Sequence, residues 1–285
     1  MTHTAVHRPP ELKLERLHGR PLIMGILNVT PDSFSDGGRF AALPAAVEHA
    51  RDMVSAGADI IDIGGESTRP GARPVGEQQE LDRVVPIIEA LVGQLAHTGE
   101  FDVTLSIDTS KPAVMRAAVA AGAGLINDVR ALQEPGALQA ASEAGVPVCL
   151  MHMQGRPADM QADPTYTDVV EQVLAFLHER RAAAVAAGIP AGRVLLDPGF
   201  GFGKRLEHNL ALFAALPRFA QAAPVLVGVS RKGMIGELLD DPGADRMIGS
   251  VTAALMAARH GAAILRVHDV RATAQALAVW HSLGG

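Results

Sequence analysis

The sequence repeats one pattern eight times: a short, mostly apolar run stops at a polar residue, and a segment with helical spacing follows. The eight runs occupy residues 22–27, 60–63, 103–107, 124–126, 146–151, 194–196, 224–229 and 263–267. Short apolar runs are typical of strands that are buried on both faces. Strands that alternate with helices form a parallel sheet with right-handed crossovers. The pattern therefore predicts an α/β protein.

Length distinguishes between the two common forms of such a sheet. An α/β barrel occupies about 250 residues as one domain, and this chain has 285. Eight units in this length favour a single-domain (β/α)8 (TIM) barrel over an open doubly wound sheet. No Gly-x-Gly-x-x-Gly follows the first run, which counts against a dinucleotide-binding fold. We predict a loose N-terminal extension over residues 1–15 and one barrel over residues 16–285.

Composition narrows the possible partners and location. The formal net charge of −6 argues against nucleic acid or an anionic membrane as a partner. No apolar stretch is long enough to span a bilayer, and residues 1–10 lack the apolar centre of a signal peptide. The single cysteine, Cys149, excludes an internal disulfide and a cysteine-based zinc site. We therefore expect a soluble, cytoplasmic protein.

A polar residue stands at the end of each predicted strand. These residues are Asn28, Asp62, Asp108, Asn127, His152, Asp197, Ser230 and His268. In a parallel barrel the carboxyl ends of all strands meet at one rim, where barrel enzymes keep their active sites. Any one of these residues can equally be a turn former. Eight together favour an enzyme or a ligand-binding barrel over a structural one.

Residues 193–204 show this pattern most clearly. A buried run ends at Asp197, Pro198 then removes a backbone donor, and three alternating glycines allow a tight loop. A strand that delivers a carboxylate to a glycine-rich loop is one way in which α/β enzymes place a polar group beside a ligand.

The polar residues at this rim form two chemical sets. One set can hydrogen-bond a flat heterocycle rich in N–H and amino groups. Its members are Asp108, Asn127, Asp197 and Lys232. The other set is cationic and suits phosphate or diphosphate oxygens. Its members are Arg69, Arg266, His268 and, as a further candidate, Arg231. For Arg231, a salt bridge at the barrel surface is at least as good an explanation.

Other candidates carry a weaker signal. The side-chain oxygen of Asn28 suits a hard divalent ion such as Mg²⁺, which would take its other ligands from phosphate and water. His152 is better explained as a packed histidine, and Glu66 as a structural hydrogen-bonding group in a turn. The histidines in helical segments are interpreted as surface or packing residues: His178, His208 and His260. Residues 201–204 lack the spacing of a Walker phosphate loop.

Seven motifs together resemble the dihydropteroate synthase family of the bacterial folate pathway. They are Asn-Val-Thr-Pro-Asp-Ser-Phe-Ser-Asp-Gly-Gly (28–38), Gly-Gly-Glu-Ser-Thr-Arg-Pro-Gly (64–71), Ser-Ile-Asp-Thr (106–109), Ile-Asn-Asp-Val (126–129), Asp-Pro-Gly-Phe-Gly-Phe-Gly-Lys (197–204), Ser-Arg-Lys (230–232) and Arg-Val-His-Asp (266–269). The match runs from about residue 22 to residue 280, which is nearly the whole chain.

The resemblance implies a barrel that joins 7,8-dihydropterin-6-ylmethyl diphosphate to 4-aminobenzoate, with Mg²⁺ as cofactor and a homodimer as the assembly. By motif, the pterin ring is held by Asp108, Asn127, Asp197 and Lys232. The residues that face the diphosphate and its Mg²⁺ are Asn28, Thr68, Arg69, Arg266 and His268. The aminobenzoate pocket is lined by Thr68, Phe202 and Ser230. The residues expected to act in catalysis are Phe34, Asp36, Asp108 and Lys232.

The chemistry of this reaction favours a dissociative path. The C–O bond to diphosphate breaks at a carbon attached to an electron-rich pterin, and anionic Asp108 would stabilise the resulting cation. The loops 28–38 and 64–71 are expected to close over the site and exclude water, with Phe34 and Asp36 reaching into it.

Two alternatives stay open. A pterin-binding methyltransferase with a corrinoid partner would share the acidic pocket, but it has no need for the motifs at 64–71 and 230–232. A catalytically inactive pterin-binding paralogue is expected to lose its loop residues. Those residues are intact here: Asn28, Phe34, Asp36, Thr68 and Arg69.

Overall fold

The computed structural model describes residues 12, 20–29, 38–68, 71–98, 103–156, 159–241 and 243–285. Within these residues the chain forms eight strands in one parallel sheet. They are β1 (Leu22–Asn28), β2 (Ile60–Gly64), β3 (Thr104–Asp108), β4 (Leu125–Asp128), β5 (Val148–Met151), β6 (Val194–Asp197), β7 (Leu226–Val227) and β8 (Ile264–Val267).

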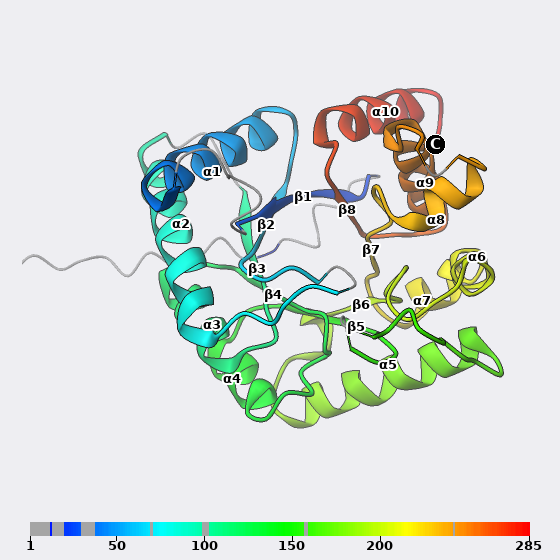
Figure 1. The fold of residues 1–285 in the computed structure, drawn as a ribbon, viewed down its shortest axis with the longest axis horizontal. Helices are drawn as coiled ribbons and strands as arrows, with labels where there is room; N and C mark the ends of the chain where they lie inside the picture. Colours follow the sequence, from blue (N-terminus) through cyan, green and yellow to red (C-terminus); the bar gives the residue numbers. More distant parts are fainter. Residues whose placement is uncertain are drawn as a thin grey trace, which may run out of the picture.

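The sheet curls into a barrel. Its strand order is β6-β5-β4-β3-β2-β1-β8-β7, and a parallel bridge between Leu196 and Val225 joins the two ends of that order. The helices lie around the outside of the strands (Figure 1). They are α1 (Gly38–Ser55), α2 (Glu77–Thr98), α3 (Pro112–Ala121), α4 (Ala137–Ala144), α5 (Val169–Ala186), α6 (Leu206–Ala214), α7 (Leu216–Ala222), α8 (Gly233–Leu238), α9 (Met247–Arg259) and α10 (Val270–Ser282), with a short 3-10 turn, η3 (Ala191–Arg193), before β6. The predicted single-domain (β/α)8 barrel is confirmed.

Two element boundaries differ from the sequence prediction. The sequence predicts a first helix from about Pro44, whereas α1 begins at Gly38 and contains Pro44. Proline is most common in the first turn of a helix, because it has no N–H to donate, so its place further inside α1 is unusual. Strand β7 covers only Leu226–Val227 of the predicted run 224–229. The chain turns at Ser230 and Arg231 soon afterwards, and Arg231 has a φ of 57°.

Strand residues divide by alternation between two apolar clusters. Those of one parity, including Ile61, Leu105 and Ile126, pack between the sheet and the helices. Those of the other parity fill the inside of the barrel. This inner cluster contains Leu12, Leu22, Met24, Ile60, Leu125, Cys149, Leu195, Leu226, Ala263 and Ile264. Leu12 falls within the predicted N-terminal extension and is buried in this cluster, while residues 1–11 and 13–15 lie outside the described residues.

A polar layer lies directly above the inner cluster. On four strands the residue two positions after an inner apolar residue is charged or an amide, and it therefore shares the inner face. These residues are Asp62, Asn127, Asp197 and Arg266. The apolar cluster thus closes the amino-terminal end of the barrel, and the polar layer forms a floor at the carboxyl ends of the strands.

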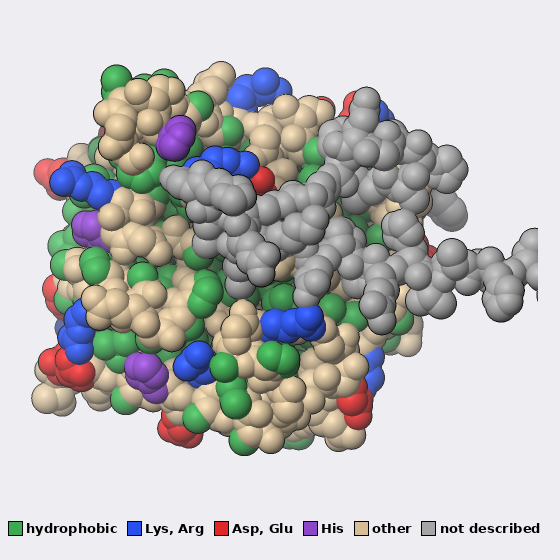
Figure 2. Space-filling model, turned by 180° about the vertical axis from the view of Figure 1, so that it is seen from behind, with side chains coloured by type: hydrophobic (Ala, Val, Ile, Leu, Met, Phe, Trp, Pro, Cys, Tyr) green, Lys and Arg blue, Asp and Glu red, His purple; other side chains and the backbone are tan. Residues whose placement is uncertain are grey.

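The surface shows mixed chemistry on the side seen in Figure 2. Its described Lys, Arg, Asp and Glu side chains are scattered singly among apolar and neutral atoms. Among the described residues, no helix combines the length and apolar character needed to cross a membrane.

Candidate active site

A cavity of about 1080 Å³ opens above the polar layer. This volume is at the upper end of the range of small-molecule sites. The predicted residues that line it are Asn28, Thr68, Asp108, Phe202, Ser230, Lys232, Arg266 and His268, together with the further candidate Arg231. Asn127 and Asp197 are buried in the floor, at 4% and 6% exposure. Phe34, Asp36 and Arg69 lie outside the described residues.

The centre of the floor is a network around Asp62, a carboxylate that is fully buried. Ser106 Oγ donates to Asp62 Oδ1 at 2.6 Å. Asn127 Nδ2 and Arg266 Nε both donate to Asp62 Oδ2, at 3.1 and 2.7 Å. Asp62 therefore joins three strands, because its partners come from β3, β4 and β8.

Arg266 connects Asp62 to the predicted catalytic carboxylate. Its Nη2 atom donates to Asp108 Oδ2 at 2.8 Å. Burial raises the pKa of Asp108 to about 7, since desolvation outweighs the attraction of Arg266 and Asp62 adds repulsion. Burial opposes the charge of Arg266, yet the two carboxylates raise its pKa above the ordinary range. Arg266 faces carboxylates as well as the cavity, so its predicted role toward diphosphate stays a prediction.

The glycine-rich loop after β6 is packed against the chain that follows β5. The backbone nitrogen of Gly199 donates to Asp197 Oδ1 at 2.7 Å. Asp197 is therefore both a floor residue and a turn former. Gly199 has a φ of +70°, and a Cβ atom there would lie 1.9 Å from the carbonyl oxygen of His152. Gly203 has a φ of +62°, and its added Cβ would lie 2.4 Å from the carbonyl oxygen of Gln154. Only glycine fits at these two positions.

Lys204 turns inward and fastens this loop. Its Nζ atom donates to the carbonyl oxygens of His152, Gly199 and Phe202 at 3.2, 2.9 and 3.0 Å. It also lies 3.0 Å from His152 Nδ1. Burial and the nearby ammonium lower the pKa of His152 to about 3, so the ring is neutral at pH 7 and Nδ1 accepts. His152 packs edge-on against Phe176 with the ring centroids 4.9 Å apart, which confirms the predicted packed histidine.

Lys232 lies where the two predicted ligand pockets meet. Its Nζ donates to the carbonyl oxygen of Phe200 and stands 4.5 Å from the centroid of the Phe202 ring. Burial lowers the pKa of Lys232 to about 8, although Asp197 attracts the charge. The ammonium is thus held over an aromatic face and beside a floor carboxylate.

Ser230 and His268 tie together the ends of β7 and β8. Ser230 Oγ accepts a hydrogen bond from the backbone nitrogen of His268 at 3.2 Å and lies 3.1 Å from its Nδ1 atom. Both side chains line the cavity. The structure therefore brings together a predicted aminobenzoate residue and a predicted diphosphate residue.

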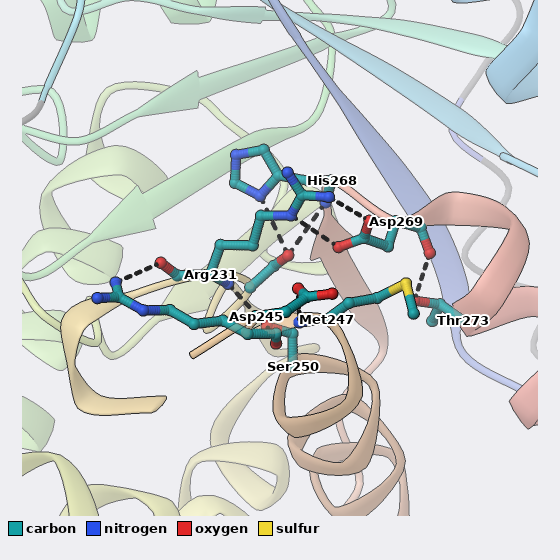
Figure 3. Close-up of polar contacts among 9 residues, drawn as sticks. Arg231, Asp245, Met247, Ser250, His268, Asp269 and Thr273 are labelled. Atoms are coloured by element: carbon teal, nitrogen blue, oxygen red, sulfur yellow. Dashed lines mark hydrogen bonds and ion pairs between the residues drawn. The ribbon is translucent and has the colours of Figure 1, made fainter. Parts of the chain in front are cut away.

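Arg231, between Ser230 and Lys232, makes the surface salt bridge that the sequence offered as an alternative to anion binding. Its guanidinium faces Asp269, with Nε donating to Asp269 Oδ2 at 2.9 Å (Figure 3). Its backbone nitrogen donates to Ser250 Oγ at 2.8 Å. These bonds hold a non-glycine residue at a φ of 57°, a conformation that costs roughly 1–3 kcal/mol. The turn directs its two neighbours into the cavity.

This strain leads to a stability prediction. Arg231→Gly and Arg231→Ala both lose the bond to Asp269, but only glycine tolerates the left-handed backbone without strain. We expect Arg231→Gly to have the higher free energy of unfolding of the two, by about 1 kcal/mol. Urea unfolding of both variants measures the difference. An alanine variant as stable as the glycine variant would contradict the assigned strain.

Glu66 supports the base of the second loop. Its Oε1 atom accepts a hydrogen bond from the backbone nitrogen of Val75 at 3.0 Å. Its other oxygen pairs with Lys111, which also pairs with buried Glu80. These contacts confirm the prediction that Glu66 is a structural hydrogen-bonding residue.

In the sequence, Asp62 stands at a strand end with no predicted role. Lys204 appears there only as the last residue of a segment that loosely resembles a phosphate loop. A signal for Asp62 was present, because a carboxylate inside the apolar run Ile60–Ile63 must be buried with partners. No local signal marked Lys204, whose partner His152 lies 52 residues away.

Comparison with known proteins identifies the family. The sequence profile of the family described as "Pterin binding enzyme" matches residues 24–268. Dihydropteroate synthase of Escherichia coli strain K12 is 54% identical over 260 residues, which cover 91% of this chain and 90% of that protein. The corresponding enzyme of Haemophilus influenzae is 53% identical, with 92% and 94% covered.

Solved structures agree with the sequence matches. Xanthomonas albilineans dihydropteroate synthase with 4-aminobenzoic acid superposes with a TM-score of 0.86 at 54% identity, covering 94% of each chain. The same enzyme in complex with 7,8-dihydropteroate has a TM-score of 0.82 at 51% identity, with 94% and 95% covered. A Yersinia pestis dihydropteroate synthase in a sulfonamide drug complex has a TM-score of 0.86 at 54% identity, with 96% of each chain covered. The chain therefore belongs to the pterin-binding enzyme family, among its dihydropteroate synthases.

Proposed function

We propose that this chain, a transferase, condenses 7,8-dihydropterin-6-ylmethyl diphosphate with 4-aminobenzoate to give 7,8-dihydropteroate and diphosphate. The observation that carries the proposal is the hydrogen-bond network of Asp62, Asp108, Asn127 and Arg266 at a cavity of about 1080 Å³. The Xanthomonas albilineans relative has been solved with 7,8-dihydropteroate, the expected product.

The floor suits a pterin ring. Carboxylates accept hydrogen bonds from ring N–H and amino groups, and a buried ring must satisfy all of these groups to bind. Asp108, Asn127 and Asp197 supply acceptors from three strands. Lys232, beside Asp197, supplies a donor for a ring oxygen or nitrogen.

The chemical step is a displacement at the methylene carbon of the pterin. The C–O bond to diphosphate breaks with its electron pair on the leaving oxygen, and the amine nitrogen of 4-aminobenzoate forms the new C–N bond and loses a proton. Anionic Asp108 stabilises positive charge that develops on the pterin, while Arg266 and His268 stabilise negative charge on the departing diphosphate.

Asn28 would hold a magnesium ion, because its side-chain oxygen is a hard ligand and it lines the cavity. Among the described residues, no group of three or more His, Cys, Asp or Glu side chains could hold a metal. The ion would take its other ligands from diphosphate and water. When bound, the ion would neutralise charge on the leaving group.

The aminobenzoate pocket is assigned to Ser230, Thr68 and Phe202, which lie along the cavity wall. Because the Yersinia pestis relative has been solved in a sulfonamide drug complex, we expect sulfonamides to compete with 4-aminobenzoate here. The homodimer and the cytoplasmic location inferred at the outset stay predictions.

The test is product formation by purified protein. With the pterin diphosphate, Mg²⁺ and 4-aminobenzoate, we expect diphosphate release in step with 7,8-dihydropteroate, and loss of both after chelation of Mg²⁺. Pterin binding without release in any condition would instead support the inactive paralogue. Transfer of a methyl group from methyltetrahydrofolate to a corrinoid would support the methyltransferase alternative.

A further inference from the structure

Asp62 is a buried carboxylate that the proposed reaction does not use directly. It is fully buried and accepts from Ser106, Asn127 and Arg266. With an arginine and a serine hydroxyl already donating to it, Asp62 presents only acceptor atoms to the amide of Asn127. The amide nitrogen must therefore turn toward Asp62, since the alternative places two oxygens against one another.

This constraint fixes the other end of the amide. Asn127 carries one donor group and one acceptor group on a rigid plane, so a nitrogen held by Asp62 leaves the oxygen for a different partner. Within the described residues, no hydrogen bond reaches Asn127 Oδ1. This oxygen is nevertheless not fully buried, so a ligand can reach it. Asn127 is in register with Asp108 on the adjacent strand, and Asp108 lines the cavity. The free oxygen thus lies beside the place assigned to the pterin.

We propose that Asp62 is a positioning residue that makes Asn127 an obligate hydrogen-bond acceptor, so that the floor selects a heterocycle with an N–H or amino donor at that position. This inference rests on the proposed pterin-binding function. It assigns selectivity to a residue that does not itself touch the ligand. A ligand with a ring acceptor at that position would meet a second acceptor and bind poorly.

The structure provides a graded set of variants. Asp62→Asn can still accept from Asn127 through its own carbonyl oxygen, because the Ser106 hydroxyl can turn from donor to acceptor for the new amide. Asp62→Leu has a similar size and no acceptor. We expect the pterin Kd of Asp62→Asn to stay within about 3-fold of wild type and that of Asp62→Leu to rise at least about 10-fold.

A double-variant cycle distinguishes positioning from general damage. If Asp62 acts through Asn127, Asp62→Leu should change the pterin Kd by less than about 3-fold in an Asn127→Ala background. The probe is a 7,8-dihydropterin without the diphosphate, measured by calorimetry without 4-aminobenzoate, because Asp62 also holds Arg266, which is assigned to the diphosphate. A loss of similar size in both backgrounds would overturn the inference, as would a wild-type Kd in Asp62→Leu.

A measurement on the wild-type protein avoids dependence on the folding of the Asp62 variants. The side-chain NH₂ resonance of Asn127, identified by its absence in Asn127→Ala, should exchange slowly with solvent and shift little when pterin binds, because it faces Asp62. A large shift on binding would show that the nitrogen faces the ligand and would overturn the inference. If the protein binds pterin but forms no dihydropteroate, the proposed function is wrong. The binding results above would still decide whether Asp62 positions Asn127.

Discussion

Asp108→Asn is expected to lower kcat by about 10²-fold or more, because it removes the negative charge of a largely buried carboxylate that stabilises the developing pterin cation. Asparagine has nearly the same shape and keeps an acceptor, so the pterin Kd should change much less than kcat. Steady-state kinetics and pterin calorimetry on the same preparation separate the two effects. A kcat close to wild type would remove the charge-stabilising role from Asp108.

The pH dependence of the wild-type enzyme provides the internal control for this prediction. Burial raises the pKa of Asp108 to about 7, and only the ionised form carries the required charge. The wild-type kcat should therefore fall as pH decreases below about 7, and Asp108→Asn should lack this inflection. The effect of pH on stability has the opposite sign to its effect on kcat. The folded state binds the proton more tightly than the unfolded state, so the contribution of Asp108 to the free energy of unfolding decreases as pH rises from about 4 through 7.

Lys204→Met is expected to reduce the free energy of unfolding by about 3 kcal/mol. The substitution leaves three carbonyl oxygens and His152 Nδ1 without their donor, and each buried unsatisfied group costs about 1–3 kcal/mol. Removing the desolvated ammonium offsets part of this cost. Urea unfolding at constant pH measures the difference.

The adjacent residue supplies a matched control for Lys204. Arg205 pairs with Asp163 at the surface, and its side chain is 53% exposed. Arg205→Met should change the free energy of unfolding by less than about 1 kcal/mol, because exposed ion pairs contribute little. If both variants lose the same free energy of unfolding, the buried hydrogen bonds of Lys204 contribute no more to stability than an exposed ion pair.

The fold could be predicted because its signals are local. Each strand is a short apolar run and each carboxyl end carries its own polar residue, so the barrel and its active rim follow from pattern alone. The inner polar layer could also have been derived by counting two residues on from Ile60, Leu125, Leu195 and Ile264. The extent of β7 and the start of α1 could not, because the turn at Arg231 depends on tertiary contacts and Pro44 is tolerated inside a helix.

The pairing of the polar groups could not be predicted in the same way. Arg266 meets Asp62 across 204 residues of sequence, because β1 pairs with β2 on one side and with β8 on the other. The sequence therefore predicted Arg266 as an anion ligand without its carboxylate partners. It likewise identified Asn127 as a pterin residue without indicating which end of its amide faces the ligand.

The position of the single cysteine gives the barrel a built-in chemical reporter. Cys149 lies in the inner cluster with no exposed surface, and burial raises the pKa of its thiol. A thiol reagent can reach this sulfur only after strands separate, and the reactive thiolate is rare until that happens. Because the sulfur lies in the inner cluster, movement confined to the carboxyl-terminal rim of the barrel would leave it covered. The rate of thiol labelling in the native protein thus reports opening of the barrel itself, separately from local movement at its rim.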